Sequence, residues 1–510
     1  MKRLLKTLNL TMQEWSWVLY DVGNSAFILL VTAIVPIYFH SLTDGAGLTE
    51  AQYVSYWGYA TSIATVVVAL IGPICGTLAD HRGFKKALFI GCMLLGALGC
   101  AALGGAWSWL SFLVIFVVAK IGFNSSLVFY DAMLPEITTE ERMDNVSSMG
   151  YALGYIGSVI PFVVCLVVVL NASGFGLSTG TAMVIAFCLT AAWWILCTLP
   201  LLKAYRQRAF VEHTGNPLTG SFRRLGKTFR EVKQQKHIFL YMVAFFFFID
   251  GVYTIIGMAT TYGQSLGLDS TGLLLALLVT QIVAFPCSIL FGKLSARFDT
   301  GLLIKVCILC YSGITLFGVF LQSLWQFWML AVLVGMFQGG IQALSRSYLG
   351  KIIPPERSGE YFGLMDIFGK GADAMGPALV AVITNLMGER TIHFFGTELK
   401  GQNIGVGFLV VLFAIGFPLL LPHMHDRYFF AADIMTVIMA FAAFEYFPGA
   451  FLVQFGSLLG YHAYLKMRFL LPMRYGGWAM LTALCIAALY FASGFDEKTP
   501  GAGKNVLDKT

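Results

Sequence analysis

Two aspartates stand inside long apolar runs of this sequence. Asp21 lies in the string Tyr20-Asp-Val-Gly-Asn24-Ser, and Asp250 lies in Phe-Ile-Asp-Gly-Val-Tyr253. A carboxylate inside a membrane span is costly and rarely faces lipid. When it is desolvated, it can exchange a proton near neutral pH. We therefore interpret both groups as candidates for proton or substrate binding, with a hydrogen bond between helices as the other explanation.

A second set of charges lies in a later apolar run. Asp366, Lys370 and Asp373 follow the spacing i, i+4, i+7, which places them on one face of a helix. An unpaired ammonium deep in a span costs about 3 kcal/mol on insertion scales. We expect Lys370 to pair with one or both of these aspartates in a charge network.

The composition is that of a membrane protein. The chain of 510 residues is 58% hydrophobic and only 12% charged, whereas soluble chains carry about 25% charged residues. Its net charge of +6 is concentrated in loops, which does not indicate nucleic-acid binding. The ten cysteines lie within or beside apolar runs, so we expect no metal site. No G-x-x-x-x-G-K-[ST] string is present, which argues against a pump that hydrolyses ATP. We also expect no cofactor.

A short basic loop separates two of the apolar runs, 53–78 and 87–106. Its sequence is Gly76-Thr-Leu-Ala-Asp-His-Arg-Gly-Phe-Lys-Lys86. Each run reaches the ~20 residues that a span needs. Such basic loops resist translocation and mark the cytoplasmic face. We expect Asp80 to lie near the start of the eleventh span, around residues 356–363, where free N–H groups favour an anion.

Parts of the first half recur later in the chain. The string Gly292-Lys-Leu-Ser-Ala-Arg-Phe-Asp299 begins 216 residues (292 − 76) after the basic loop begins. The string from Asp131 to Ile137 corresponds to that from Arg346 to Ile352, at a spacing of 215 residues (352 − 137). Two blocks with nearly the same spacing predict duplicated halves.

These patterns predict an all-α polytopic membrane protein with twelve spans in two six-helix halves. We assign residues 1–202 to the first half, 203–237 to a cytoplasmic basic linker, 238–421 to the second half, and 422–510 to two or three appended spans with a polar tail. Lys and Arg are concentrated in the inner loops, which predicts a cytoplasmic N-terminus. We expect a multi-pass protein of the bacterial inner membrane.

The string G-x-L-A-D-x-R-G-x-K-K resembles the signature loop of the major facilitator superfamily. Other strings narrow the resemblance to its vacuole-effluxer branch, which comprises the autophagy-related amino-acid effluxer of fungal vacuoles and many bacterial relatives. These strings are Tyr20-Asp21-x-x-Asn24-Ser25-Ala26-Phe27, Phe129-Tyr130-Asp131-Ala-Met-Leu-Pro135-Glu136, Asp250-Gly251-Val252 and Gln338-Gly-Gly-Ile-Gln342-Ala-Leu-Ser345-Arg346-Ser347. The resemblance spans about residues 15–417.

The resemblance implies a secondary transporter, not an enzyme, that moves amino acids or related small metabolites by alternating access. A proton gradient or the substrate's own gradient would drive it, and we expect a monomer in the lipid bilayer. In this fold the first, fourth, seventh and tenth spans line a central cavity. The implied substrate or proton contacts are Asp21, Asn24, Asn124, Asp250, Tyr253, Gln338 and Gln342. The expected cytoplasmic gate consists of Gly76, Asp80, Arg82, Gly83, Lys85, Lys86, Asp131, Arg142 and Arg346.

Residues 422–510 depart from the family. The string Pro422-His-Met-His-Asp-Arg-Tyr-Phe429 resembles the C-terminal part of multispan glycosyltransferases that use lipid-linked sugars. Accessory helices, a sequence artefact and a sugar-transfer site remain open, so the alternative function is an enzyme that acts on lipid-linked sugar.

Removal of all residues after Leu421 separates the two functions. A transporter keeps its transport rate in reconstituted vesicles after this truncation, because its two halves remain complete. An enzyme that acts through the tail loses its activity.

Overall fold

Long apolar helices form almost all of the described chain. The computed structural model describes residues 9–48, 50–211, 230, 235–387, 391–394, 397–420 and 482. The chain divides into two compact units, Met1–Leu420 and Leu421–Thr510. The appended spans expected in the second unit lie outside the described residues, apart from Thr482.

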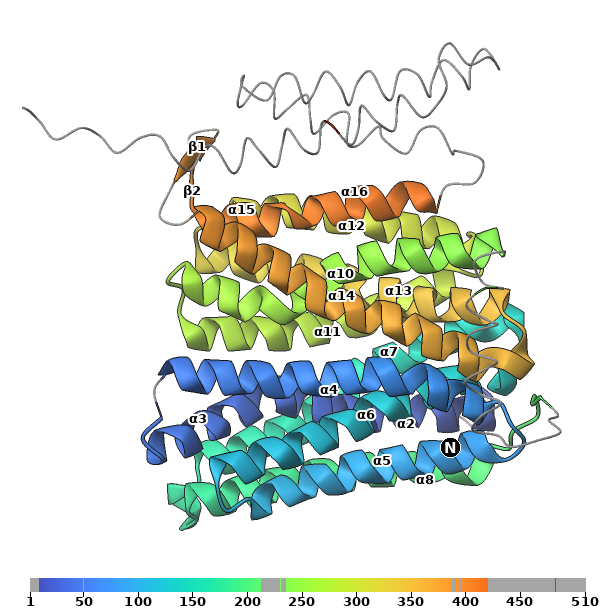
Figure 1. The fold of residues 1–510 in the computed structure, drawn as a ribbon, viewed down its shortest axis with the longest axis horizontal. Coiled ribbons are helices and arrows are strands. Elements are labelled where there is room, and N and C mark those ends of the chain that lie inside the picture. The colour runs from blue at the N-terminus through green and yellow to red at the C-terminus, as the bar shows by residue number, and fades with distance from the viewer. Residues whose placement is uncertain are drawn as a thin grey trace, which may run out of the picture. The chain divides into compact units, whose positions relative to one another are not determined.

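The first half begins with a helix that is interrupted by a π-helical turn (Figure 1). Its elements are α2 (Met12–Leu29), η1 (Leu30–Ile34), α3 (Val35–Gly45), α4 (Glu50–Ala79), α5 (Phe84–Ala102), η2 (Leu103–Gly105), α6 (Trp109–Ile137), α7 (Glu140–Leu170), η3 (Ser173–Phe175) and α8 (Thr179–Ala204). No loop separates α2, η1 and α3, so these three elements form one span.

The second half repeats this pattern. Its elements are α10 (Lys236–Ser265), α11 (Ser270–Leu294), α12 (Thr300–Val319), α13 (Leu324–Ile352), η4 (Pro355–Arg357), α14 (Ser358–Met387), β1 (Ile392–Phe394), β2 (Thr397–Leu399), α15 (Gly401–Gly407) and α16 (Leu409–Leu419). The antiparallel pair of β1 and β2, in which Ile392 faces Leu399, was not predicted.

The helix lengths agree with a multi-pass membrane protein. Within the described residues, ten helices are long and apolar enough to cross a bilayer. The interrupted first helix and the pair α15–α16 bring the number of spans to twelve. The all-α polytopic class is thereby confirmed.

Polar residues determine where several helices begin. At each of these positions a hydroxyl or carboxylate accepts a hydrogen bond from a first-turn backbone N–H, which has no partner inside the helix. The capping residues are Thr11, Ser108, Ser178, Asp269, Asp299 and Ser323.

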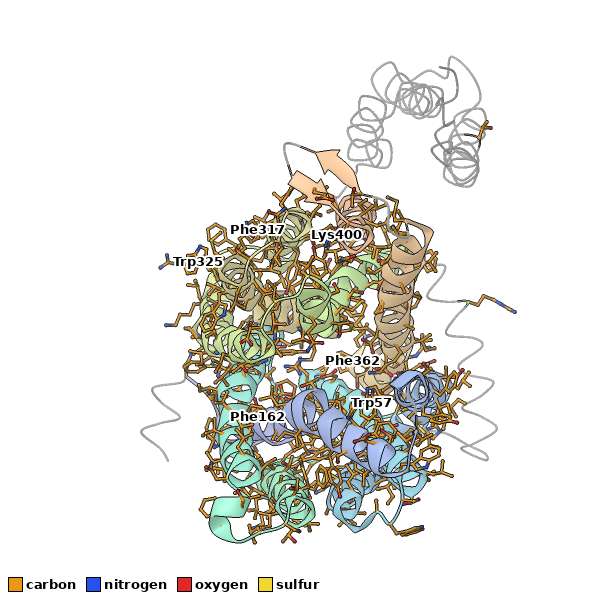
Figure 2. All side chains as sticks on the ribbon, turned by 90° about the vertical axis from the view of Figure 1, so that its left-hand side faces the viewer. Trp57, Phe162, Phe317, Trp325, Phe362 and Lys400 are labelled. Carbon is orange, nitrogen blue, oxygen red and sulfur yellow. The ribbon has the colours of Figure 1, made fainter. Side chains whose placement is uncertain are left out.

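Each half has its own buried apolar core. In the first core Trp17 stacks on Tyr130, with ring centroids 4.3 Å apart. Where the halves meet, α4 packs against α14 and α7 packs against α11. Other apolar side chains cover the outside of the bundle, among them Trp325, which is 74% exposed (Figure 2). So much exposed apolar surface requires a hydrocarbon environment.

An ion pair holds the start of the first helix against the loop between α6 and α7. Arg142 donates from Nε to Glu14 Oε1 at 2.9 Å and from Nη2 to Glu14 Oε2 at 2.7 Å. Thr138 donates to the same carboxylate at 2.6 Å. The Glu14 side chain is 2% exposed. We expected Arg142 in the gate, but its described partners all belong to the first half, so its contacts stabilise that half.

Replacement of this arginine tests its role. Arg142→Met leaves the buried Glu14 carboxylate with only Thr138 and the backbone as partners, and should reduce the free energy of unfolding by about 1–3 kcal/mol. Thermal unfolding in detergent measures this loss. Arg206→Met is the control, because Arg206 is exposed and makes no contact of this kind with the residues that the structure describes. The prediction would be contradicted if Arg142→Met had the same melting temperature as Arg206→Met.

Candidate functional site

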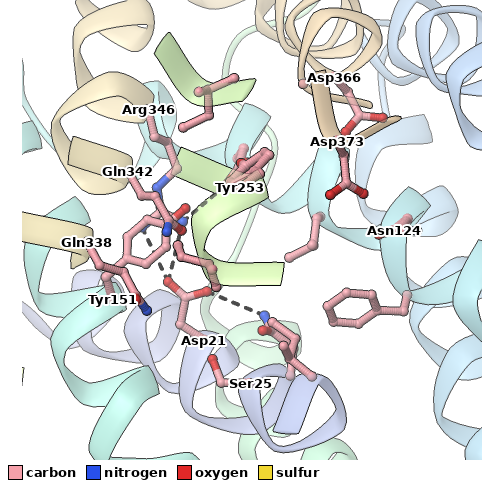
Figure 3. Close-up of a pocket in the computed structure, with 18 of the residues that line it drawn as sticks. Asp21, Ser25, Asn124, Tyr151, Tyr253, Gln338, Gln342, Arg346, Asp366 and Asp373 are labelled. Carbon is pink, nitrogen blue, oxygen red and sulfur yellow. Dashed lines mark hydrogen bonds and ion pairs between the residues drawn. The ribbon is translucent and has the colours of Figure 1, made fainter. Parts of the chain in front are cut away.

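A cavity of about 420 Å³ lies between the two halves (Figure 3). Residues of α2, α6 and α7 line it from the first half, and residues of α10, α11, α13 and α14 line it from the second. Its wall combines apolar and aromatic side chains with a few charged ones, as in many small-molecule sites. The expected cavity residues found in this wall are Asp21, Asn24, Asn124, Tyr253, Gln338 and Gln342.

Asp250 is the expected cavity residue that does not line this cavity. Its side chain is fully buried between α10 and α14, where Thr254 donates a 3.4 Å hydrogen bond to its Oδ1. A side chain on Gly376 of α14 would overlap it. The cavity face of α10 includes Ile249, Tyr253 and Ile256 instead. Asp250 lies about 100° around the helix from Ile249 and therefore faces a neighbouring helix.

Arg346 of α13 inserts its guanidinium into the first half. Nη1 donates to Asp131 Oδ1 at 3.1 Å, and Nη2 lies 3.3 Å from Asp21 Oδ2. Nε donates to Ser147 Oγ at 2.9 Å. The guanidinium also lies 4.6 Å from the ring centroid of Trp17 and 4.5 Å from that of Tyr151. We expected Asp131 and Arg346 in the gate, and the structure shows that both also line the cavity.

Asp131 and Arg346 are corresponding residues in the duplication that the sequence predicts. They are 215 positions apart, which is the spacing of the predicted repeat. The structure shows that these two residues contact each other across the halves.

Asp80 caps a helix of the opposite half. Its carboxylate accepts hydrogen bonds from the backbone N–H groups of Gly359, at 2.8 Å, and Glu360, at 3.0 Å. These N–H groups form the start of α14, where the helix dipole favours an anion. A side chain on Gly76 would overlap the carbonyl oxygen of Gly359, so the close approach of α4 to α14 requires glycine there. This is the contact that the sequence predicted for Asp80.

Lys85 joins the two halves at the same place. Its buried ammonium lies 2.6 Å from Glu136 Oε1 and donates to Ser358 Oγ of the second half at 2.8 Å. It also lies 3.8 Å from Asp80 Oδ1. Because a buried ammonium needs several acceptors, this set of contacts fixes the position of the loop relative to α14.

The remaining residues of the basic loop bind the segment 205–211, which follows α8. Arg82 lies over the ring of Phe210 at 5.4 Å, and Lys86 donates to the carbonyl oxygen of Tyr205 at 3.3 Å. Gly83 has a positive φ of 81° and donates its N–H to Gln207 at 2.9 Å. We expected Arg82, Gly83 and Lys86 to gate the two halves, whereas their described contacts hold the start of the linker.

Sequence reasoning missed the second polar contact between the halves. Asp144 of α7 accepts hydrogen bonds from Thr300 and Ser347, each at 2.6 Å, and its Oδ2 lies 2.7 Å from Lys351 Nζ. All three partners belong to the second half. The repeat offered an indirect signal, because Asp144 occupies the place equivalent to Gly359, the residue that Asp80 contacts. These bonds and those of Asp80 lie at one end of the bundle, which we call the basic end.

The charge network on α14 contains the expected pair of Lys370 and Asp366 and one partner that was not predicted. Lys370 donates to Asn124 Oδ1 of α6 at 3.0 Å, whereas its distance to Asp366 Oδ1 is 4.0 Å. Asp373 accepts no hydrogen bond and forms no ion pair within the described part of the chain. Lys370 therefore pairs with Asp366 of its own helix, as expected, and also binds an amide of the other half.

The fold and this interface cavity define the class of the protein. The bundle superposes on the major facilitator transporter FucP, crystallised in an outward conformation, with a TM-score of 0.57 and 16% identity over 80% of this chain and 97% of that one. It superposes on the proton:xylose symporter XylE with a TM-score of 0.58 and 10% identity over 80% and 93%. The fold is that of the solved major facilitator transporters.

Sequence comparison narrows this class to one family. The family described as "Vacuole effluxer Atg22 like" matches residues 11–427, and the chain belongs to that family. The uncharacterized MFS-type transporter YxiO of Bacillus subtilis is 42% identical over 80% of this chain and 94% of its own length. Autophagy-related protein 22-1 of Aspergillus niger is 26% identical over 54% of this chain and 46% of its own length. The chain is thus a secondary transporter and not an enzyme.

A pair of aspartate caps tests the gate. Asp80→Ala removes a cap that crosses the halves, whereas Asp269→Ala removes one within the second half. Each loses about 1 kcal/mol of capping. We expect a lower transport rate in reconstituted vesicles for Asp80→Ala only, with both variants inserted normally. Wild-type rates for Asp80→Ala at equal expression would remove Asp80 from the gate.

Proposed function

We propose that this protein moves amino acids or related small metabolites across the bacterial inner membrane by alternating access, with its basic end in the cytoplasm. The orientation is supported by the positive charge of the loops at that end, because short basic loops resist translocation. The substrate class is the one implied by the resemblance of the sequence to amino-acid effluxers, and the matching family is described as vacuole effluxers.

The observation that carries this proposal is the position of the bonds between the halves. The contacts of Asp80, Lys85 and Asp144 close the basic end, while the cavity lies beside them between the same halves. To reach the cytoplasm from this cavity, a substrate needs these bonds to break. A cavity with a breakable seal at one end is the arrangement that alternating access requires.

Coupling to protons is the second part of the proposal. Asp21 and Asp131 share one guanidinium, that of Arg346, so this buried group carries one negative charge in excess. A proton on one carboxylate neutralises it. We assign the proton to Asp21, whose Oδ1 lies 3.4 Å from the Asn24 amide at the cavity surface. Protonation weakens the hold of Asp21 on Arg346, one of the contacts between the halves.

Removal of the proposed proton site should uncouple transport from the pH gradient. Asp21→Asn mimics the protonated acid and leaves Arg346 paired one to one with Asp131. A gradient of one pH unit supports at most about tenfold accumulation for one proton per substrate. We expect this ratio to fall to about one in Asp21→Asn vesicles, while counterflow of labelled amino acids continues.

Asp131→Asn is the matched variant, since it also leaves a one-to-one pair at Arg346. It should retain accumulation driven by the pH gradient. Full accumulation by Asp21→Asn would refute the assignment, and loss of counterflow as well would indicate a role for Asp21 in substrate binding.

A further inference from the structure

A second polar cluster faces the cavity across from the Arg346 group and has no part in the gate or the proton site. Its cavity-lining members are Asn124 on α6 and Asp366, Lys370 and Asp373 on α14, and Lys120 of α6 lies behind the cavity wall within electrostatic range of Asp373. Figure 3 shows Asp366, Asp373 and Asn124 on one side of the pocket, with Asp21, Gln338 and Arg346 on the other. The cluster contains two carboxylates and two ammonium groups, so it is balanced in charge.

Several hydrogen-bonding groups of this cluster have no partner in the described part of the chain. Asp373 is exposed to the cavity, and its carboxylate accepts no hydrogen bond there. Asn124 accepts from Lys370 through Oδ1, but its Nδ2 donates to no described residue, although the side chain is only 5% exposed. The Oδ2 atom of Asp366 is also buried without a partner. Charged and amide groups inside a membrane are costly unless something binds them.

The donors and acceptors of the cluster lie side by side. Lys370 and Asp373 are three residues apart on α14, so they are neighbours on the helix surface. The Lys370 ammonium has three N–H groups, and its contact with Asn124 uses one of them. Lys120 lies within electrostatic range of both Lys370 and Asp373. The cavity therefore presents a free carboxylate next to an ammonium and an amide donor.

We propose that this cluster binds a zwitterionic head group, an ammonium and a carboxylate on one carbon, as in an α-amino acid. The ligand's ammonium binds Asp373, and its carboxylate binds Lys370 Nζ and Asn124 Nδ2. A ligand with only a positive charge would be repelled by Lys370, and one with only a negative charge would be repelled by Asp373. A zwitterion places an opposite charge at each of the two residues. This site rests on the proposed transport of amino acids and names the groups that recognise them.

The cluster lies where a bound ligand would contact both halves of the protein. Asn124 belongs to the first half, whereas Lys370 and Asp373 belong to the second. A head group held by all three bridges the two halves and favours their closure around the cavity. The rest of the ligand then extends along the apolar and aromatic wall, which includes Phe123, Tyr253 and Ile256.

The test uses the full chain in proteoliposomes. Counterflow is measured with each of the twenty labelled proteinogenic L-amino acids. For each one transported, its amide, which lacks the carboxylate, and its 2-oxo acid, which lacks the ammonium, are added as unlabelled competitors. We expect both analogues to compete at least about tenfold more weakly than the parent amino acid, because each loses charge-assisted hydrogen bonds.

Variants of Asp373 provide the second readout. Asp373→Asn should raise the half-saturating concentration at least about tenfold, and Asp373→Glu should recover part of this loss. Asp44→Asn should behave like the wild type, because Asp44 is an exposed carboxylate outside the cavity wall.

The outcomes distinguish this site from the proposed function. If an amino acid is transported and both analogues compete as strongly as the parent amino acid, the head-group site is overturned and amino-acid transport stands. The same holds if Asp373→Asn has the half-saturating concentration of the wild type. Transport of none of the twenty amino acids would overturn both.

Discussion

The structure depends on charges of one half whose partners belong to the other. Arg346 is buried among the carboxylates and aromatic rings of the first half, and Asp144 is surrounded by donors of the second. A buried charge that loses its partner in a dry environment costs about 3–5 kcal/mol. In the proposed transport cycle, the halves separate at the basic end only when water or a proton replaces these partners.

The backbone contacts at the basic end have a different character. Asp80 binds N–H groups at a helix start, and Gly76 and Gly359 allow two helices to touch along their backbones. Such a cap contributes about 1 kcal/mol and is directional. It therefore aligns α4 with α14 while contributing little to the free energy that holds the halves together. The buried ion pairs and the cap thus have separate roles, one energetic and one geometric.

The sequence predicted the features that depend on composition and local spacing. Apolar runs predicted the twelve spans, and the short basic loop predicted that Asp80 would meet the start of α14. The rotation of a helix about its own axis was harder to predict. The sequence around Asp250 resembles that around Asp21, but the Asp250 carboxylate faces Gly376, whereas Asp21 lines the cavity. Partners in distant segments were also hidden: no local pattern connects Arg142 with Glu14, Asp144 with Lys351, or Lys370 with Asn124.

The contact between Asp131 and Arg346 has a consequence for the predicted duplication of the halves. If the two halves were once identical, positions 131 and 346 would have held the same residue, and two aspartates or two arginines at this distance repel each other. The present pair of opposite charges became possible only after the copies began to diverge. From then on neither half could replace the other, because each supplies a charge that its former twin lacks.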